Sequence, residues 1–166
     1  MDRLEKGNPP VVSQGVLAKL VARFGQDGFA LVEDKGDPYI TAPAASVREV
    51  MAFLRDDPEL RFDQLLIVTG VDYADHIDVL YHLRSYSNPA TIAIKVTVAR
   101  DGGSLPSIAD IHPAADWHER ETFDMLGVRF ERHPNLRRIL LPEDWDGHPL
   151  RKDYKQPEEY HGIANS

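Results

Sequence analysis

Residues 77–98 read IDVLYHLRSYSNPATIAIKVTV, and this stretch decides the fold. Apolar side chains occupy every second position on both sides of the central SNPA segment, which is the period of a strand that buries one face. Ser, Asn and Pro between the two halves are typical of a turn. We therefore expect a long antiparallel hairpin with one face in the core.

Three further strands are expected on the N-terminal side of this hairpin. Residues 62–69, FDQLLIVT, are more continuously apolar, which predicts a central strand of the sheet. The short apolar runs FALVE and PYITA, residues 29–33 and 38–42, flank a segment whose Asp, Lys and Gly residues suit a tight turn.

Two amphipathic helices are predicted before the hairpin. Apolar residues recur at helical spacing over residues 13–24, and Ser13 precedes them as an N-cap. A second helix is expected over about residues 46–56. There Ser46 and Glu49 have the spacing of a capping box, and a proline follows the last turn.

A third helix is predicted over residues 113–126, with Gly127 at its C-terminal end. Asp116, Arg120 and Asp124 are spaced four apart, so we expect an acid-base-acid ladder along one face. A brief strand follows. The fold class is therefore α+β, a mostly antiparallel sheet with helices packed on one face, followed by a long extended C-terminal arm.

The predicted domain boundaries follow from a change in the sequence near residue 133, where regular helix and strand patterns stop. We expect an α+β domain over residues 1–112, a helix and short strand over 113–132, and an extended partner-binding arm over 133–166. Prolines recur every seven or eight residues in the arm and prevent any long helix there. Its many Leu, Ile, Trp and Tyr side chains need a surface on which to lie.

Composition excludes several kinds of function. The chain has 166 residues, enough for one sizeable core, and its longest apolar run is far shorter than the roughly 20 residues that span a bilayer. There is no cysteine, which excludes disulfides, thiolate zinc sites and Cys-ligated iron-sulfur clusters. A net charge of -8 argues against nucleic-acid binding, and the charged N-terminus predicts a cytoplasmic protein.

Catalytic chemistry finds little support in the residue patterns. His112, His118 and His133 suggest a metal-dependent enzyme, but they lack a two-histidine spacing on one helical face. Glu119 and Glu121 point too far apart on a helix to act as an acid-base pair. No phosphate-binding loop or activated nucleophile is present. We therefore expect no catalytic, cofactor-binding or metal residues in this chain.

The stretch EDWDGHPLRKDY, residues 143–154, points to binding of a protein partner. Trp, Tyr and Arg dominate binding hot spots, and guanidinium groups hold carboxylates with two hydrogen bonds. Two arrangements remain open. The arm could dock on another protein, or it could fold back over its own sheet or third helix. In the second case Arg137 or Arg138 would pair with Glu119, Glu121 or Asp124.

Residues 118–154 also resemble a known family. HERETFDMLGVRFERHPNLRRILLPEDWDGHPLRKDY is similar to the signature of the C subunit of type 1 NADH-quinone oxidoreductase, bacterial respiratory complex I. Its mitochondrial counterpart is the iron-sulfur protein 3 subunit. W-x-E-R-E-x-x-D-x-x-G is met from Trp117 to Gly127, H-P-x-L-R-R-I-L from His133, and D-W-x-G-H-P-L-R-K-D-Y from Asp144 to Tyr154. This match covers about a quarter of the chain.

The resemblance implies a subunit of the hydrophilic arm on the cytoplasmic side of the inner membrane, with no cofactor of its own and no membrane insertion. Its tail would wrap around the D subunit, which helps to form the quinone site, beside neighbouring iron-sulfur subunits. FMN, iron-sulfur clusters and quinone belong to the complex, which moves electrons from NADH to quinone and pumps protons. An equivalent subunit of a membrane-bound hydrogenase or of a dehydrogenase with another donor is the alternative.

The predicted subunit-interface residues are those of the three motifs. Trp145 and Tyr154 are expected as buried anchors, and Arg137, Arg138 and Arg151 as carboxylate clamps. The full set is Trp117, Glu119, Arg120, Glu121, Asp124, Gly127, His133, Pro134, Arg137, Arg138, Asp144, Trp145, Gly147, His148, Pro149, Arg151, Lys152, Asp153 and Tyr154.

Overall fold

The predicted hairpin is confirmed in the computed structural model, which describes residues 9–33 and 36–164. Strands β4 (His76–Ser85) and β5 (Ala90–Ala99) run antiparallel, with Val79 opposite Val96. The odd-numbered residues of β4 and the even-numbered residues of β5 are buried from Ile77 to Val98. One face of the hairpin therefore lies in the core, as its alternation indicates.

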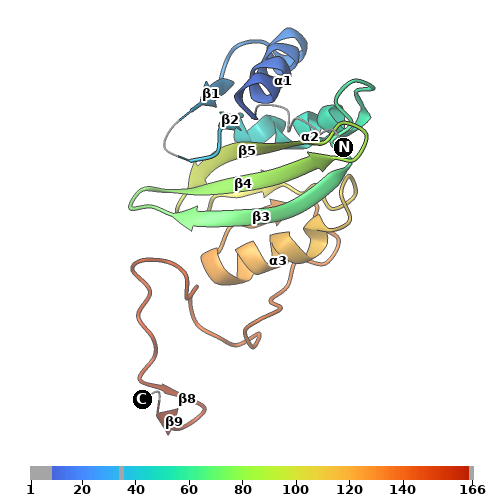
Figure 1. The fold of residues 1–166 in the computed structure, drawn as a ribbon. Helices are drawn as coiled ribbons and strands as arrows, with labels where there is room; N and C mark the ends of the chain where they lie inside the picture. The colour runs from blue at the N-terminus through green and yellow to red at the C-terminus, as the bar shows by residue number, and fades with distance from the viewer. Residues whose placement is uncertain (1–8, 34–35, 165–166) are drawn as a thin grey trace, which may run out of the picture.

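Five strands form the main sheet, in the order β1-β2-β5-β4-β3. Strands β1 (Ala30–Val32) and β2 (Tyr39–Thr41) form an antiparallel pair, β2 joins β5 in parallel, and β4 pairs with β3 (Gln64–Asp72) in antiparallel register. The sheet is mixed but mostly antiparallel (Figure 1), so the predicted fold class is confirmed.

The prediction that residues 62–69 form a central strand is wrong, because β3 lies at the edge of the sheet. Its register shifts between Leu65 and Ile67, and Leu66 and Ile67 are both exposed. A continuous apolar run indicated burial on both faces, whereas here a bulge turns part of that run to solvent.

All three helices pack against the buried face. They are α1 (Pro9–Phe24), α2 (Val47–Asp56), which follows a short 3-10 turn at Ala44–Ser46, and α3 (Ala115–Leu126). Each supplies buried side chains to one core together with the inward residues of β4 and β5. Figure 1 shows α3 beside β3 at the lower edge of the sheet, away from α1 and α2.

Two predicted helix caps are wrong. Helix α1 begins at Pro9, so Ser13 lies buried within the helix and is not its N-cap. Ser46 does occupy the N-cap of α2, but its side chain makes no capping hydrogen bond and its backbone is helical in conformation. The preceding 3-10 turn already carries the chain into the helix, which removes the extended N-cap geometry that a capping box requires.

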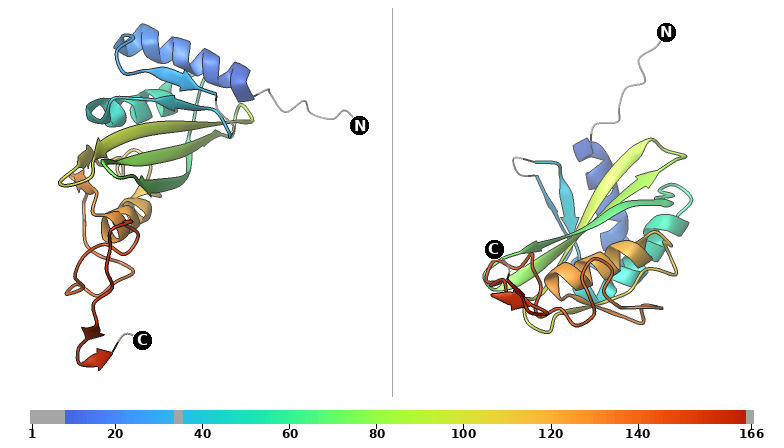
Figure 2. Two further views of the ribbon diagram at one scale, coloured as in Figure 1. Left: turned by 90° about the vertical axis from the view of Figure 1, so that its left-hand side faces the viewer. Right: turned by 90° about the horizontal axis from the view of Figure 1, so that it is seen from below.

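The chain after α3 contains little regular structure. Strands β6 (Ser104–Pro106) and β7 (Arg129–Glu131) pair in parallel, so the brief strand after α3 is confirmed. Residues 132–158 contain no helix or strand. A small hairpin not predicted from the sequence follows, β8 (Glu159–Tyr160) with β9 (Ile163–Ala164), and it stands away from the sheet (Figures 1 and 2). Among the described helices none has the length and hydrophobicity that spanning a bilayer requires.

Candidate functional site

The arm satisfies the C-terminal end of α3. The last four carbonyls of a helix have no hydrogen-bond partner within the helix, and in α3 these are the carbonyls of residues 123–126. Gly127 N–H donates to the first at 2.9 Å, His148 Nδ1 lies 2.9 Å from the second, Leu150 N–H donates to the third at 3.1 Å, and Arg151 Nε donates to the fourth at 2.7 Å. Positive charge at this end of a helix is also favoured by the helix dipole.

Asp124 fixes the middle of the arm. Its side chain is fully buried, and one oxygen accepts a 2.7 Å bond from Arg138 Nη1. The other accepts the backbone N–H groups of residues 139–141 at 2.8 to 3.0 Å. Burial alone would raise the pKa of Asp124, but these N–H groups and the guanidinium hold it below its usual value. The pairing of Arg138 with Asp124, expected if the arm folds back, is confirmed.

Arg138 also joins two distant parts of the arm. Its Nη2 donates to the carbonyls of Trp145 and Gly147, at 3.0 Å each. The Trp145 indole N–H donates to the hydroxyl of Tyr154 at 3.0 Å, and both side chains are half-buried against other parts of the arm. Gly147 has φ +79°, and a Cβ there would lie 3.0 Å from the Tyr154 ring. The arm therefore has a compact shape of its own near residue 147.

Residues 151–153 attach the arm to the sheet. Arg151 donates to Asp101 Oδ1 and to the carbonyl of Arg100, and Lys152 N–H donates to Asp72 Oδ2 at 2.7 Å. Arg100 bridges the carboxylates of Asp72 and Asp153. Its guanidinium lowers the pKa of Asp72 to about 2, against the opposing effect of burial. Charged motif residues thus hold this segment on the ends of β3 and β5.

Glu119 attaches the loop after β6 to α3, and His133 attaches the start of the arm to the first turn of the same helix. Glu119 is fully buried and accepts bonds from the Ser107 hydroxyl at 2.6 Å and the Ile108 N–H at 2.8 Å. Burial raises the pKa of Glu119 to about 7, although both donors favour its charged form. His133 Nδ1 accepts the Asn135 N–H, so Nε2 carries the proton and donates to the carbonyl of Asp116. Neither side chain faces solvent.

The expected acid-base-acid ladder on α3 does not form. Arg120 donates to the carbonyls of Arg137 and Arg138, at 3.3 and 3.4 Å, and its guanidinium lies 5.0 Å from the centre of the Trp117 ring. Asp124 is taken by the arm instead. The prediction failed because helical spacing says nothing about a distant segment that lies across the same face.

Other motif residues remain on the surface. Glu121, Pro134 and Arg137 are exposed, Pro149 is half-buried, and Asp144 binds Tyr160 and His161 of the β8–β9 hairpin at 2.8 Å each. Trp117 is 64% exposed. Two residues absent from the prediction have similar exposure, Leu140 at 60% and Leu150 at 62%. The sequence could have indicated these two leucines, because an irregular segment rich in apolar residues cannot bury every side chain.

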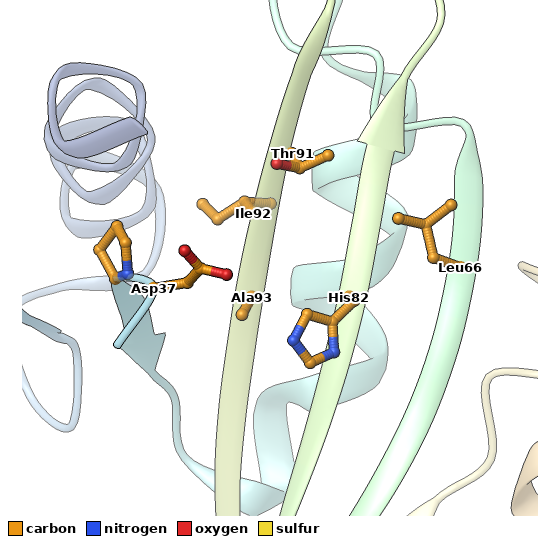
Figure 3. A pocket seen from close by; sticks show the side chains of 7 residues that line it. Asp37, Leu66, His82, Thr91, Ile92 and Ala93 are labelled. Carbon is orange, nitrogen blue, oxygen red and sulfur yellow. The ribbon is translucent and has the colours of Figure 1, made fainter. Parts of the chain in front are cut away.

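A pocket that the sequence did not predict lies on the open face of the sheet. It encloses about 260 Å³ and is lined by Asp37, Leu66, His82, Thr91 and Ala93, among others. Figure 3 shows Ala93 between Asp37 and His82. The His82 Nδ1 atom is buried without a hydrogen-bond partner. Within residues 9–33 and 36–164 no group of three or more His, Asp or Glu side chains could hold a metal ion.

Comparison with known proteins gives a consistent result. Residues 40–160 match the family described as "Respiratory-chain NADH dehydrogenase, 30 Kd subunit". The C subunit of NADH-quinone oxidoreductase from Chlorobium phaeobacteroides is 48% identical over 118 residues, which cover 69% of this chain and 71% of that protein. The same subunit from Roseiflexus sp. (strain RS-1) is 46% identical over 141 residues, covering 83% and 81% respectively.

Two solved structures share the fold. The first, "Nqo5 of the trypsin-resistant fragment (1-134) in P63 form", has a TM-score of 0.63 at 24% identity and covers 74% of this chain and 98% of its own. The second belongs to "Structure of the membrane-bound sulfane sulfur reductase (MBS), an archaeal respiratory membrane complex". It has a TM-score of 0.71 at 22% identity and covers 86% of this chain and 85% of its own.

Proposed function

The chain belongs to the family of the 30 kDa subunit of respiratory-chain NADH dehydrogenase, and from this membership we propose that it is a scaffold subunit of a proton-pumping NADH-quinone oxidoreductase. It corresponds to the C subunit in the hydrophilic arm, on the cytoplasmic side of the inner membrane. It docks on the D subunit beside iron-sulfur subunits and supports electron transfer from NADH to quinone. FMN, iron-sulfur clusters and quinone are held elsewhere in the complex.

The observation that carries the docking role is a set of large apolar side chains on segments of fixed shape. Trp117, Leu140 and Leu150 project from α3 and the arm, while the backbone beneath them is held by Asp124, Arg138 and Arg151. A tryptophan on such a surface is typical of a binding hot spot. Because internal hydrogen bonds already hold the arm in one shape, a partner that binds this shape would cost little conformational entropy.

The charged motif residues support a scaffold role over a chemical one. Glu119 and Asp124 are sealed from solvent, and their oxygens accept hydrogen bonds from the chain itself. Arg138 and Arg151 donate their hydrogen bonds to backbone carbonyls and to carboxylates of this chain. A general acid or base has to reach a substrate, and neither buried carboxylate can do so while the segments that donate hydrogen bonds to it stay in place.

A second assignment is the equivalent subunit of a respiratory complex with another electron donor. The observation that favours it is the shared fold with a subunit of the membrane-bound sulfane sulfur reductase complex. Both assignments give this chain the same docking role, and they differ in the catalytic neighbours.

The test is to tag this chain in its native host, extract the membranes gently and identify the co-purifying proteins by mass spectrometry. The D subunit together with flavin-bearing subunits is the expected result. Hydrogenase-type neighbours would select the second assignment. Recovery of the chain alone would contradict both assignments.

A further inference from the structure

Among the described strands, β3 forms one edge of the sheet and has a free backbone edge. It pairs with β4 on one side, and it has no neighbour on the other in the five-stranded sheet. Residues 64–71, QLLIVTGV, contain no charged side chain, and Leu66 and Ile67 are 41% and 43% exposed. Natural proteins protect edge strands with charges, prolines or a covering segment, because a free edge can pair with another chain. An uncharged apolar edge indicates that something covers it.

A groove runs along this edge. Four successive residues of β3, 67–70, line a space of about 160 Å³ whose other wall is α3. Successive strand residues point to opposite faces, so a groove lined by all four follows the strand's backbone edge. Met125 of α3 and Leu150 of the arm also line the groove. Figure 1 shows α3 extending alongside β3.

Gly70 sets the width of the groove at one end. A Cβ at this position would lie 2.2 Å from Leu126 Cδ1 and 3.2 Å from Thr122 Cγ2. Glycine at this position therefore lets α3 lie close to the strand without displacing the Leu126 side chain. The walls are held by the core on both sides and do not need a partner to form.

We propose that an extended segment of a neighbouring subunit adds to the free edge of β3 as a further strand, with apolar side chains in the groove and a basic side chain beside Glu121. Such strand addition uses backbone hydrogen bonds for affinity and side-chain sites for specificity. Of the described residues that line the groove, Glu121 alone is charged, and it is exposed. The net charge of -8 also favours a basic segment.

This inference rests on the proposed function, because it takes the partner to be another subunit of the complex. It also adds a surface that the motif residues did not indicate. Leu150 lines the groove and belongs to the arm, so the two surfaces are continuous.

The first test compares Ile67→Lys with Ser87→Lys in the tagged chain in its native host. Ile67 is exposed, so a lysine there extends to solvent near Glu121 and leaves the isolated chain folded, which thermal unfolding checks. We expect Ile67→Lys to lower the recovery of partner subunits by at least about tenfold. Ser87 lies exposed in the turn between β4 and β5, away from the groove, and its variant should recover them as the unchanged chain does.

The second test measures backbone pairing directly. Amide hydrogens of residues 66–71 that exchange rapidly in the isolated chain should exchange at least about tenfold more slowly in the purified complex. Equal exchange in both states, or full recovery of partners by Ile67→Lys, would overturn the inference and leave the proposed function intact. A dimer of the purified chain that Ile67→Lys dissociates would overturn it in favour of a second copy. Recovery of the unchanged chain outside any complex would reject both.

Discussion

At the scale of single residues, the buried carboxylate of Asp124 determines the path of the arm. Three backbone N–H groups and one guanidinium converge on this fully buried side chain. Asp124→Ala should destabilise the isolated chain by about 3 to 5 kcal/mol, because four hydrogen-bond donors lose their shared acceptor at the point where the arm meets α3. Urea denaturation measures this. Glu121→Ala, an exposed change on the same helix, should stay within about 0.5 kcal/mol and serves as the control.

Glu119 predicts an unusual dependence of stability on pH. Its folded pKa of about 7 lies above the ordinary value of 4.5, so the folded chain holds this proton more tightly than the unfolded chain. The contribution of Glu119 to stability is therefore complete below about pH 4.5 and declines until about pH 7. The total is of order 3 kcal/mol, at about 1.4 kcal/mol per pH unit.

The variant Glu119→Gln should flatten this decline, since glutamine does not titrate. Unfolding free energies from urea titrations between pH 4.5 and pH 8 provide the measurement. Asp72, whose pKa is lowered to about 2, acts in the opposite direction and only below about pH 4, so it does not overlap this window. An identical slope in the variant and the unchanged chain would show that Glu119 stays ionised when buried.

A substitution of Trp117 should affect binding to a partner and the stability of the isolated chain differently. Its ring is largely exposed, and the Arg120 guanidinium lies 5.0 Å from the ring centre. Trp117→Ala should leave the unfolding free energy of the isolated chain within about 1 kcal/mol, since a cation-π contact at an exposed site is weak. It should weaken association with the proposed partner, the D subunit, by about 2 to 4 kcal/mol if the ring is a hot spot. Binding measured with purified subunits decides, and unchanged affinity would remove Trp117 from the interface.

At the scale of elements, the end of α3 and the arm form one unit that meets at Gly127. This residue has φ +80°, and a Cβ there would lie 2.6 Å from His148 Nε2 and 2.8 Å from an Arg151 nitrogen. Gly127→Ala should therefore both strain the backbone and displace the arm from the helix end. Hydrogen exchange should speed up for residues 147–152. Gly102→Ala is the matched control: φ is +70° there with no atom within 4 Å, so only the strain of about 1 kcal/mol remains.

At the scale of the whole molecule, a well-packed sheet with three helices carries a tail whose attachment weakens toward its end. Residues 151–153 are bound to the sheet, whereas Lys155 is exposed and the β8–β9 hairpin meets the arm through Asp144 and Trp145. Among the trypsin sites of residues 129–164, the one after Lys155 should therefore be cleaved first in the isolated chain. In the assembled complex this cleavage should be slower if a partner covers the arm. Mass spectrometry of timed digests identifies the order of cleavage, and a cut after Arg138 before the one after Lys155 would contradict the attachment of Arg138 to Asp124.

Local patterns predicted most of the elements correctly. Alternation specified the hairpin and its buried face, helical spacing specified α2 and α3, and a glycine marked the end of α3. These features depend on neighbours within a few residues, which a sequence displays directly. The dense motifs also indicated the family, because so many residue types in one order rarely recur by chance. The predictions of the two helix caps were wrong because α1 begins before Ser13 and because the backbone of Ser46 is helical rather than extended.

The position of β3 and the partners of the charges were not local properties. An apolar run does not reveal whether a strand has one neighbour or two, so β3 was expected in the centre and lies at the edge. Arg120 was expected to pair with its helical neighbours but binds carbonyls 17 and 18 residues away. Residue types and their order along the chain specified the elements and the family. The edge position of β3, the groove beside it and the attachment of the arm to α3 depend on contacts between segments far apart in the sequence. These contacts form only when the whole chain has packed.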